Sequence, residues 1–325
     1  MEQRHLGRTG LRVSRLALGT MTWGRDVPEH EAADQLKAFA EAGGTLVDTA
    51  DVYSEGTAEY LLGRLTESLV PREELVICTK SGRVADRSRR IDGSRGHLLT
   101  ALDASLHRLG TDHVDLWLVH AFDPHTPAEE TLHALDLAVS SGRARYVGLA
   151  DHSGWQLARA ATWQRAVPGR TPLAAAQMEY SLLQRGIERE VLPAAQDAGI
   201  GMLAASPLAR GVLTGKYRHG TPADSRGAGT LAGLVQPYLD EDSRLIVDAV
   251  ATAADGLATS PLQVALAWVR DRPGVASAVV GARTATQLAS ALGAESLCLP
   301  DEIRSVLDDI SAPLHFYPDQ DWTVL

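Results

Sequence analysis

The chain has 325 residues, of which 45% are apolar and 22% are charged, the proportions of an ordinary globular protein. Its formal net charge of −10 argues against a binding surface for nucleic acid or for an anionic membrane. Any bound anion must therefore be held by a few local basic residues.

Targeting and redox signals are weak. The opening stretch MEQRHLGRTG has no apolar signal core, and no apolar run is long enough to cross a bilayer. Cys78 and Cys298 lie among apolar residues and predict buried, unpaired thiols in a reducing compartment. We therefore expect a cytoplasmic protein whose partner is a small molecule, with no nucleic-acid or membrane partner.

Short apolar runs alternate with amphipathic stretches along most of the chain. The runs are RLALGT (15–20), TLVDTA (45–50), LVICTK (75–80), VDLWLVH (114–120), ARYVGLA (144–150), LAAAQMEY (173–180), GIGMLAASP (199–207) and ASAVVGA (276–282). They are continuously apolar, which is typical of parallel strands buried on both faces. The pattern predicts a (β/α)8 TIM barrel, as one α/β domain over residues 1–325. A doubly wound open sheet is the alternative, which the absence of a Gly-x-Gly-x-x-Gly turn disfavours.

Two segments depart from this alternation. The front segment RHLGRTGLRVS predicts a β-hairpin that could plug the amino-terminal mouth of the barrel. A long connection follows the seventh strand, at about residues 208–243, and is rich in Gly, Pro and Ala. Long irregular loops in compact domains often act as lids or clamps, so we expect this one to be functional.

Polar side chains end three consecutive predicted strands or follow them closely. Asp48 ends the second strand and is followed by Tyr53, Lys80 ends the third, and His120 ends the fourth. In a barrel of this kind these ends face the active site. A phenol titrates near about 10, so an adjacent ammonium held by a carboxylate would lower that pKa and favour proton transfer. The histidine could stabilise a developing oxyanion.

A metal site is not predicted from the histidines. None of them lies in an HExxH or similar spacing, and His120 and His125 are separated by Pro124, which breaks any helical register between them. Each polar strand-end residue taken alone is more simply a solvated or packing side chain. Together the four predict an acid-base site.

The same residues carry a resemblance to the aldo-keto reductase superfamily. The matching motifs are LALGTMTWG, VDTADVYSEGTAEYLLG, ICTKSG, DLWLVHAFDP, QMEYSLLQR, SPLARGVLTGKY and VVGARTATQL. They cover nearly the whole chain in order, and they are most similar to the bacterial branch that also resembles the potassium-channel β subunits. The resemblance implies a (β/α)8 barrel that binds NADPH without a separate dinucleotide-binding domain.

The resemblance also implies roles for individual residues. Tyr53 would protonate a carbonyl oxygen, Lys80 and Asp48 would tune it, and His120 would orient the carbonyl. Trp23 would form a substrate wall, although a tryptophan at the edge of the core fits equally well. The cofactor-binding positions implied are Thr20, Met21, Asp151, Gln177, Ser206, Leu208, Gly211, Lys216, Arg226, Gly281, Arg283 and Gln287. Arg226 and Arg283 match basic residues near the adenosine 2′-phosphate and favour NADPH over NADH.

Several cofactor contacts of the family are missing. The usual Ser-Asn pair after the fifth strand is replaced by Ala150 and Asp151, and an aromatic residue that stacks on nicotinamide is replaced by Ala205. At the adenine end Gln287 is followed by Ser290 and Ala291 instead of the usual Glu/Asn-Asn. Each loss costs about 0.5–1.5 kcal/mol, so together they could weaken binding by roughly 10²–10⁴-fold.

Three functions remain in view at this point. The first is an NADPH-dependent reductase of aldehydes or ketones. The second is a redox-neutral enzyme (a dehydratase, isomerase or cyclase) that uses the same acid-base residues and no hydride. The third is a non-catalytic NADP(H)-binding protein, by analogy with the channel β subunits.

Overall fold

A closed barrel of eight parallel strands forms the centre of the protein in the computed structural model, which describes residues 1–84 and 90–313. The strands are β3 (Leu16–Gly19), β4 (Leu46–Asp48), β5 (Val76–Ser81), β6 (Val114–Val119), β7 (Ala144–Ala150), β8 (Ala175–Glu179), β9 (Gly201–Ala205) and β10 (Val275–Gly281). Their order around the barrel follows the chain, and β10 closes on β3. The predicted (β/α)8 barrel and all eight of its predicted strands are confirmed.

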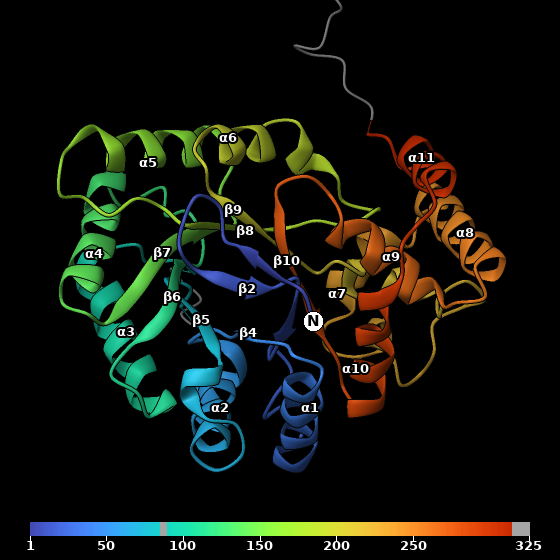
Figure 1. Cartoon of the computed structure of the whole chain (residues 1–325), viewed down its shortest axis with the longest axis horizontal. Helices are drawn as coiled ribbons and strands as arrows, with labels where there is room; N and C mark the ends of the chain where they lie inside the picture. The colour runs from blue at the N-terminus through green and yellow to red at the C-terminus, as the bar shows by residue number, and fades with distance from the viewer. Residues whose placement is uncertain (85–89, 314–325) are drawn as a thin grey trace, which may run out of the picture.

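Helices surround the barrel on its outer face (Figure 1). They are α1 (Glu29–Glu41), α2 (Thr57–Ser68), α3 (Arg95–Leu109), α4 (Ala128–Ser140), α5 (Gly154–Ala166), α6 (Val191–Asp197), α7 (Ala232–Val235), α8 (Glu241–Gly256), α9 (Pro261–Arg270), α10 (Ala285–Leu292) and α11 (Asp301–Ile310). The longer helices bury an apolar stripe against the strands or against neighbouring helices, as α8 does against α9 and α11; α1, for example, buries Leu36 and Phe39. Gly110 ends α3 in the left-handed conformation.

Two apolar cores hold these layers together. The larger one lies between the strands and the helices. The smaller one contains strand residues, such as Leu118 and Ala150, with Leu6 and Val13 of the front hairpin and no residue of a long helix. This second cluster therefore fills the inside of the barrel, so the barrel is a packed core and not a pore.

The predicted amino-terminal hairpin is present. Strand β1 (Gln3–His5) pairs antiparallel with β2 (Arg12–Ser14), and the hairpin lies across the barrel strands in Figure 1. The backbone N–H of Arg8 donates to the carbonyl of Gly199, just before β9 begins, at 2.8 Å. The hairpin therefore closes the amino-terminal end and leaves the carboxyl ends of the strands accessible.

The long connection after β9 is more regular than the sequence suggests. Its polar and glycine-rich stretch contains the short helical turns η4 (Ala209–Thr214), η5 (Arg226–Ala228) and η6 (Gln236–Tyr238), besides α7. Local hydrogen bonds between residues three apart form these turns without any apolar periodicity, which is why the sequence pattern gave no helical signal.

The two cysteines are free, and only one is buried. Cys78 lies inside the barrel, as predicted, but Cys298 is exposed, so that prediction is wrong. The segment around Cys298 is irregular, and Leu299 takes the buried position beside it. In the described ranges no single helix is long and apolar enough to span a membrane; α8 and α9 meet that test only as a pair bent by 101°.

Gly7 gives a test of how the hairpin contributes to stability. A Cβ atom there would lie 2.4 Å from the Gly199 carbonyl oxygen, and Gly7 has a left-handed φ of +58°. We expect Gly7→Ala to lower the free energy of unfolding by more than about 1–2 kcal/mol in denaturant titrations. Gly10→Ala is the control, because its nearest new contact is at 3.7 Å. Equal stability of both variants would contradict the proposed packing.

Candidate active site

The three predicted strand-end residues do converge at one mouth of the barrel. Asp48 is the last residue of β4, Lys80 lies at the end of β5, and His120 directly follows β6. These strands are consecutive neighbours in the barrel, and Asp48 is in register with Cys78, two residues before Lys80. Parallel pairing thus brings together side chains that lie far apart in the sequence.

A buried ion pair forms the base of this mouth. The Lys80 Nζ lies 2.8 Å from Oδ2 of Asp48, and the two side chains are only 1% and 5% exposed. Lys80 also donates to the carbonyl of Thr49 at 2.7 Å. From the opposite side of the barrel, Gln177 Nε2 donates to Oδ1 of Asp48 at 2.7 Å. Each charge therefore has several partners, which a buried pair requires.

Tyr53 is held over this pair by an unusual turn. It begins the 3₁₀ turn η1 (Tyr53–Gly56), in which Ser54, Glu55 and Gly56 all have positive φ. The Arg108 side chain packs against Gly56, where a Cβ would lie 2.8 Å from Cδ of Arg108. The phenol oxygen lies 3.4 Å from Nζ of Lys80.

A second ion pair, in which only the acidic partner is fully buried, lies beneath this turn. Arg108 Nε donates to Glu59 Oε2 at 2.7 Å, and Glu59 also accepts a hydrogen bond from Thr79 of β5. Glu59 is fully buried on α2. Helix α2, helix α3 and strand β5 are thereby linked under Tyr53.

The pKa values of Tyr53 and Lys80 differ from what the sequence led us to expect. Burial raises the pKa of Tyr53 above its ordinary value, and the attraction of the Lys80 ammonium opposes this shift without reversing it. Burial would lower the pKa of Lys80, but Asp48 and Tyr53 raise it instead. The expected lowering of the Tyr53 pKa is therefore wrong for this structure. Tyr53 holds its proton and Lys80 its charge at neutral pH.

His120 faces Tyr53 across the mouth. The ring centroids lie 6.0 Å apart at an interplanar angle of 81°. Burial, together with repulsion from Lys80 and Arg83, lowers the pKa of His120 well below its ordinary value. Its Nδ1 is buried and has no hydrogen-bond partner in the described part of the chain. The neutral imidazole can therefore donate one hydrogen bond to an oxygen near Tyr53.

The segment after β7 also lies at the mouth. Asp151 has a left-handed φ of 51°, and its N–H donates to the carbonyl of Gln177 at 3.1 Å. Its carboxylate Oδ2 lies 2.7 Å from Nη2 of Arg83, a residue that the sequence analysis did not select. The one signal in the sequence that could have suggested Arg83 is its place three residues after Lys80, close to a strand end, because its partner Asp151 is distant in the sequence.

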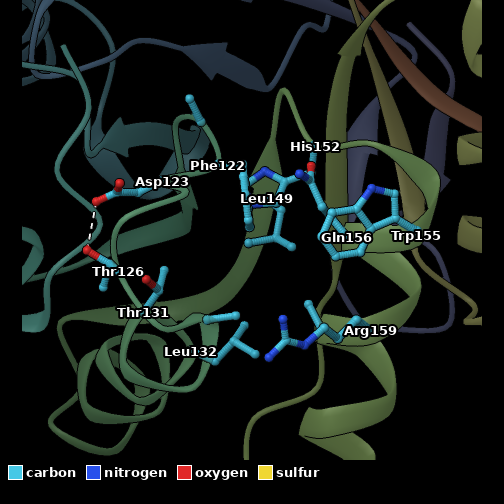
Figure 2. A pocket seen from close by; sticks show the side chains of 13 residues that line it. Phe122, Asp123, Thr126, Thr131, Leu132, Leu149, His152, Trp155, Gln156 and Arg159 are labelled. Carbon is cyan, nitrogen blue, oxygen red and sulfur yellow. Dashed lines mark hydrogen bonds between the residues drawn. The ribbon is translucent and has the colours of Figure 1, made fainter.

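Behind this segment lies a hollow between α4 and α5 (Figure 2). Phe122, just after His120, meets the rings of His152 and Trp155 edge to face at 5.7 and 5.9 Å. His152 Nδ1 lies 2.7 Å from the carbonyl oxygen of Ala150. These contacts join the segment after β6 to the segment after β7.

A basic cluster lies at the ends of β9 and β10. A Cβ on Gly211, which has a φ of +97°, would lie 3.2 Å from Nζ of Lys216. Burial lowers the pKa of Lys216, and repulsion from Arg283 and Arg226 adds to the shift. The pKa of Arg226 is likewise lowered by burial and by repulsion from Arg210. Several cations are thus held together against their own repulsion.

The remaining predicted cofactor positions lie around this mouth and cluster. Thr20 donates from its N–H and from its hydroxyl to the carbonyl of Asp48, and Gln287 accepts from the N–H of Arg283 at 3.0 Å. Ser206 has a left-handed φ of 50° just after β9. The other positions are Met21 after β3, Leu208 before η4, and Gly281 at the end of β10.

Trp23 does not line the mouth. It is fully buried, and its indole N–H donates to Oε1 of Gln35 on α1 at 3.0 Å. It therefore belongs to the core between barrel and helix, and it is not an exposed substrate wall. The sequence favoured a substrate contact because Trp23 follows the first strand, but in the structure the side chain packs against α1. Residues 1–84 and 90–313 contain no group of three or more His, Cys, Asp or Glu side chains arranged for a metal.

The sequence model described as the aldo/keto reductase family matches residues 15–312 of this chain. The chain belongs to the aldo/keto reductase family. It is 37% identical to an uncharacterized oxidoreductase of Bacillus subtilis, over 95% of this chain and 96% of the relative. It is 35% identical to a probable voltage-gated potassium channel subunit beta of Oryza sativa, over 98% of both chains. It is 36% identical to L-glyceraldehyde 3-phosphate reductase of Escherichia coli K12, over 89% and 86%.

One partly buried acid of this aldo/keto reductase has no catalytic assignment. Asp51 lies two residues before Tyr53, and its N–H donates to the carbonyl of Lys80 at 3.1 Å. Its Oδ1 is buried without a hydrogen-bond partner among the residues described. Burial, with repulsion from Glu59, raises the pKa of Asp51 from 3.8 to about 7.

This shift predicts a pH-dependent stability. Between about pH 4 and about pH 7 the unfolded chain loses the Asp51 proton while the folded protein keeps it, so stability falls across this range and levels off above about pH 7. In urea titrations, the free energy of unfolding of Asp51→Asn minus that of wild type should therefore increase by about 2 kcal/mol when the pH is raised from about 5 to about 8. Glu67→Gln, an exposed change on α2, is the control. A pH-independent difference between Asp51→Asn and wild type would contradict the assignment.

Proposed function

We propose that this chain is an NADPH-dependent oxidoreductase that reduces the carbonyl group of an aldehyde or ketone. The observation that carries the proposal is the protonated Tyr53 hydroxyl 3.4 Å from the buried, charged Lys80, with neutral His120 beside it. This arrangement supplies a proton donor and a hydrogen-bond donor at one point of the mouth. A carbonyl oxygen that becomes negative during reduction needs both groups.

The residues present fit a phosphorylated dinucleotide. Lys216, Arg226 and Arg283 are gathered beside the left-handed backbone from Ala209 to Gly211. Guanidinium groups bind phosphate with two parallel hydrogen bonds, which suits a 2′-phosphate better than a ribose hydroxyl. These groups lie at the ends of β9 and β10, while the acid-base residues lie at β4, β5 and β6. An extended ligand across the mouth could contact both sets.

Each residue has a distinct role in the proposed reaction. The reduced nicotinamide would supply a hydride to the carbonyl carbon. Tyr53 donates its hydroxyl proton to the carbonyl oxygen, which completes the alcohol. Lys80 stabilises the phenolate left behind, and Asp48 keeps Lys80 charged and in place. His120 donates a hydrogen bond that orients the carbonyl oxygen before the proton moves.

The relatives support a reductase without deciding the substrate. Two of those described above are named an oxidoreductase and a reductase of L-glyceraldehyde 3-phosphate. The missing contacts favour a second candidate, a redox-neutral acid-base enzyme. Ala150 packs in the inner core, and its side chain offers no polar atom to a nicotinamide. Binding measurements distinguish the two candidates, because only the reductase requires NADP(H).

Tyr53→Phe tests the acid. We expect kcat for NADPH-dependent reduction to fall about 10²–10⁴-fold, because the proton donor is lost. The NADPH Kd should stay within about twofold. NADPH absorbance with a panel of aromatic and aliphatic aldehydes, together with calorimetry, measures both quantities. Tyr60→Phe is the control, since Tyr60 is exposed on α2.

Each other outcome points to a different function. Turnover retained in Tyr53→Phe would contradict the assignment of the acid. No NADPH binding at about millimolar cofactor would reject the reductase. A reaction without NADP(H) that fails in Tyr53→Phe would support the redox-neutral enzyme. Tight NADPH binding with no turnover of any carbonyl would support a nucleotide-binding protein.

The basic cluster predicts cofactor preference. Wild type should bind NADPH more tightly than NADH, and Arg283→Ala should reduce that ratio by about 10-fold, because one charge-assisted contact to the 2′-phosphate is lost. NADH affinity itself should change little. Arg218→Ala is the control, since Arg218 lies two residues after Lys216 and its side chain pairs with Asp248 at 2.7 Å. An equal loss of affinity for NADPH and NADH would show that Arg283 stabilises the connection after β9 and does not contact the 2′-phosphate.

A further inference from the structure

The turn that carries Tyr53 has a strained backbone. Ser54 and Glu55 follow Tyr53 with φ values of 48° and 55°, in the left-handed region that is unfavourable for residues other than glycine. The hydrogen bond inside the turn is long, since the N–H of Glu55 lies 3.3 Å from the carbonyl of Val52. A strained backbone of this kind persists only where the surrounding structure fixes it. Contacts from outside the turn must therefore hold Tyr53 in place.

The Arg108 side chain of α3 supplies such a contact. Gly56 ends the turn with a φ of +90°, and a Cβ atom there would lie 2.8 Å from Cδ and 2.9 Å from Nε of Arg108. The backbone of Arg108 is fixed as well, because a Cβ atom on Gly63 of α2 would lie only 2.7 Å from its carbonyl oxygen. The turn and helix α2 thus both pack closely against Arg108.

The guanidinium of Arg108 is linked in turn to the strand that carries Lys80. Nε and Nη2 of Arg108 lie 2.7 and 2.6 Å from Oε2 of Glu59, whose side chain is fully buried. The second oxygen of Glu59 accepts a hydrogen bond from the Thr79 hydroxyl. Thr79 directly precedes Lys80 in β5. A continuous series of contacts therefore runs from the turn of Tyr53 to the strand of Lys80.

We infer that Arg108, acting through Glu59, is a positioning residue that fixes the Tyr53 hydroxyl beside Lys80. The distance of 3.4 Å between the Tyr53 hydroxyl and Nζ of Lys80 is long for a hydrogen bond, so this contact alone holds the phenol weakly. Arg108 acts on the backbone of the turn, beneath the mouth, and has no part in the chemistry itself. The kinetic consequence of this inference rests on the proposed function.

Arg108→Met tests the inference, because it keeps a long side chain near Gly56 and removes the contacts to Glu59. We expect kcat for NADPH-dependent carbonyl reduction to fall about 10–100-fold, since a shift of about 1 Å at a reacting group has an effect of this size. KM and the Kd of NADPH should stay within about threefold, because Arg108 lies beneath the turn. Glu59→Gln should lower kcat in the same way and replaces Arg108→Met if that variant does not fold.

Arg72→Met is the matched control. Arg72 pairs with Asp115 at 2.7 Å, and both side chains are 20% exposed, so this ion pair resembles that of Arg108 in chemistry. It lies at the opposite end of the barrel strands, because Arg72 belongs to the turn η2 (Arg72–Glu74) before β5 and Asp115 to the start of β6. Its loss should lower stability and leave kcat within about twofold of wild type. A fall in kcat of the same size in both variants would contradict the positioning role.

Combination with Tyr53→Phe separates positioning from a general loosening of the barrel. If Arg108 acts through the Tyr53 hydroxyl, Arg108→Met should change the residual kcat of Tyr53→Phe by less than about twofold, because changes that act on one group are not additive. If Arg108→Met lowers kcat by the same factor with and without that hydroxyl, Arg108 does not act through Tyr53.

A measurement that needs no turnover distinguishes failure of this inference from failure of the proposed function. 3-Fluorotyrosine introduced only at position 53 reports the surroundings of the ring by fluorine NMR. Wild type and Arg72→Met should give the same single resonance, and Arg108→Met should give a shifted resonance or several.

Each result of the fluorine measurement is decisive. Coincident spectra of wild type, Arg72→Met and Arg108→Met would overturn the positioning role, whatever reaction the enzyme catalyses. If wild type reduces no carbonyl but Arg108→Met alone alters the spectrum, the proposed function fails and the positioning role of Arg108 stands.

Discussion

The buried pair of Lys80 and Asp48 is the interaction on which the site depends. Removing either charge would leave the other uncompensated in the barrel core, a loss of about 3–5 kcal/mol in comparable proteins. The pair is retained because Thr49 and Gln177 satisfy its remaining hydrogen-bonding atoms. Gln177 also reaches Asp48 from the opposite wall of the barrel, so the pair cross-links the mouth. A barrel with well-packed apolar residues in place of both Asp48 and Lys80 could be equally stable, but it would have no charge beneath Tyr53.

That one fixed charge controls two neighbouring protonation states. It opposes the effect of burial on Tyr53, and it adds to the effect of burial on His120. The outcome is a protonated phenol beside a neutral imidazole, so both present a hydrogen to the same space. Sequence reasoning considered only the Coulomb effect on Tyr53 and therefore expected a lowered pKa. The desolvation of a side chain depends on how the rest of the chain packs over it, and a sequence motif does not predict that packing.

The strands were predictable because parallel strands buried on both faces need continuous apolar runs, and the polar residues that end them stand out. The candidate acid-base residues lie together for the same reason. Contacts that join loops were not predictable. Trp23 is buried because Gln35 accepts its indole N–H, and Arg83 reaches Asp151 across 68 positions of sequence. In each case the decisive partner lies on another element, and only the closed barrel brings the two side chains together.

The net charge of the chain likewise does not predict the charge at one site, which depends on where the basic side chains lie. The net charge of −10 alone disfavours an anionic cofactor. At physiological ionic strength, however, charges separated by more than about 8 Å are largely screened. Burial lowers the pKa of Lys216, and Arg226 and Arg283 lie close enough to lower it further. A phosphate placed among them would relieve their mutual repulsion, and that gain depends on the loop geometry after β9 and not on the overall charge of the chain.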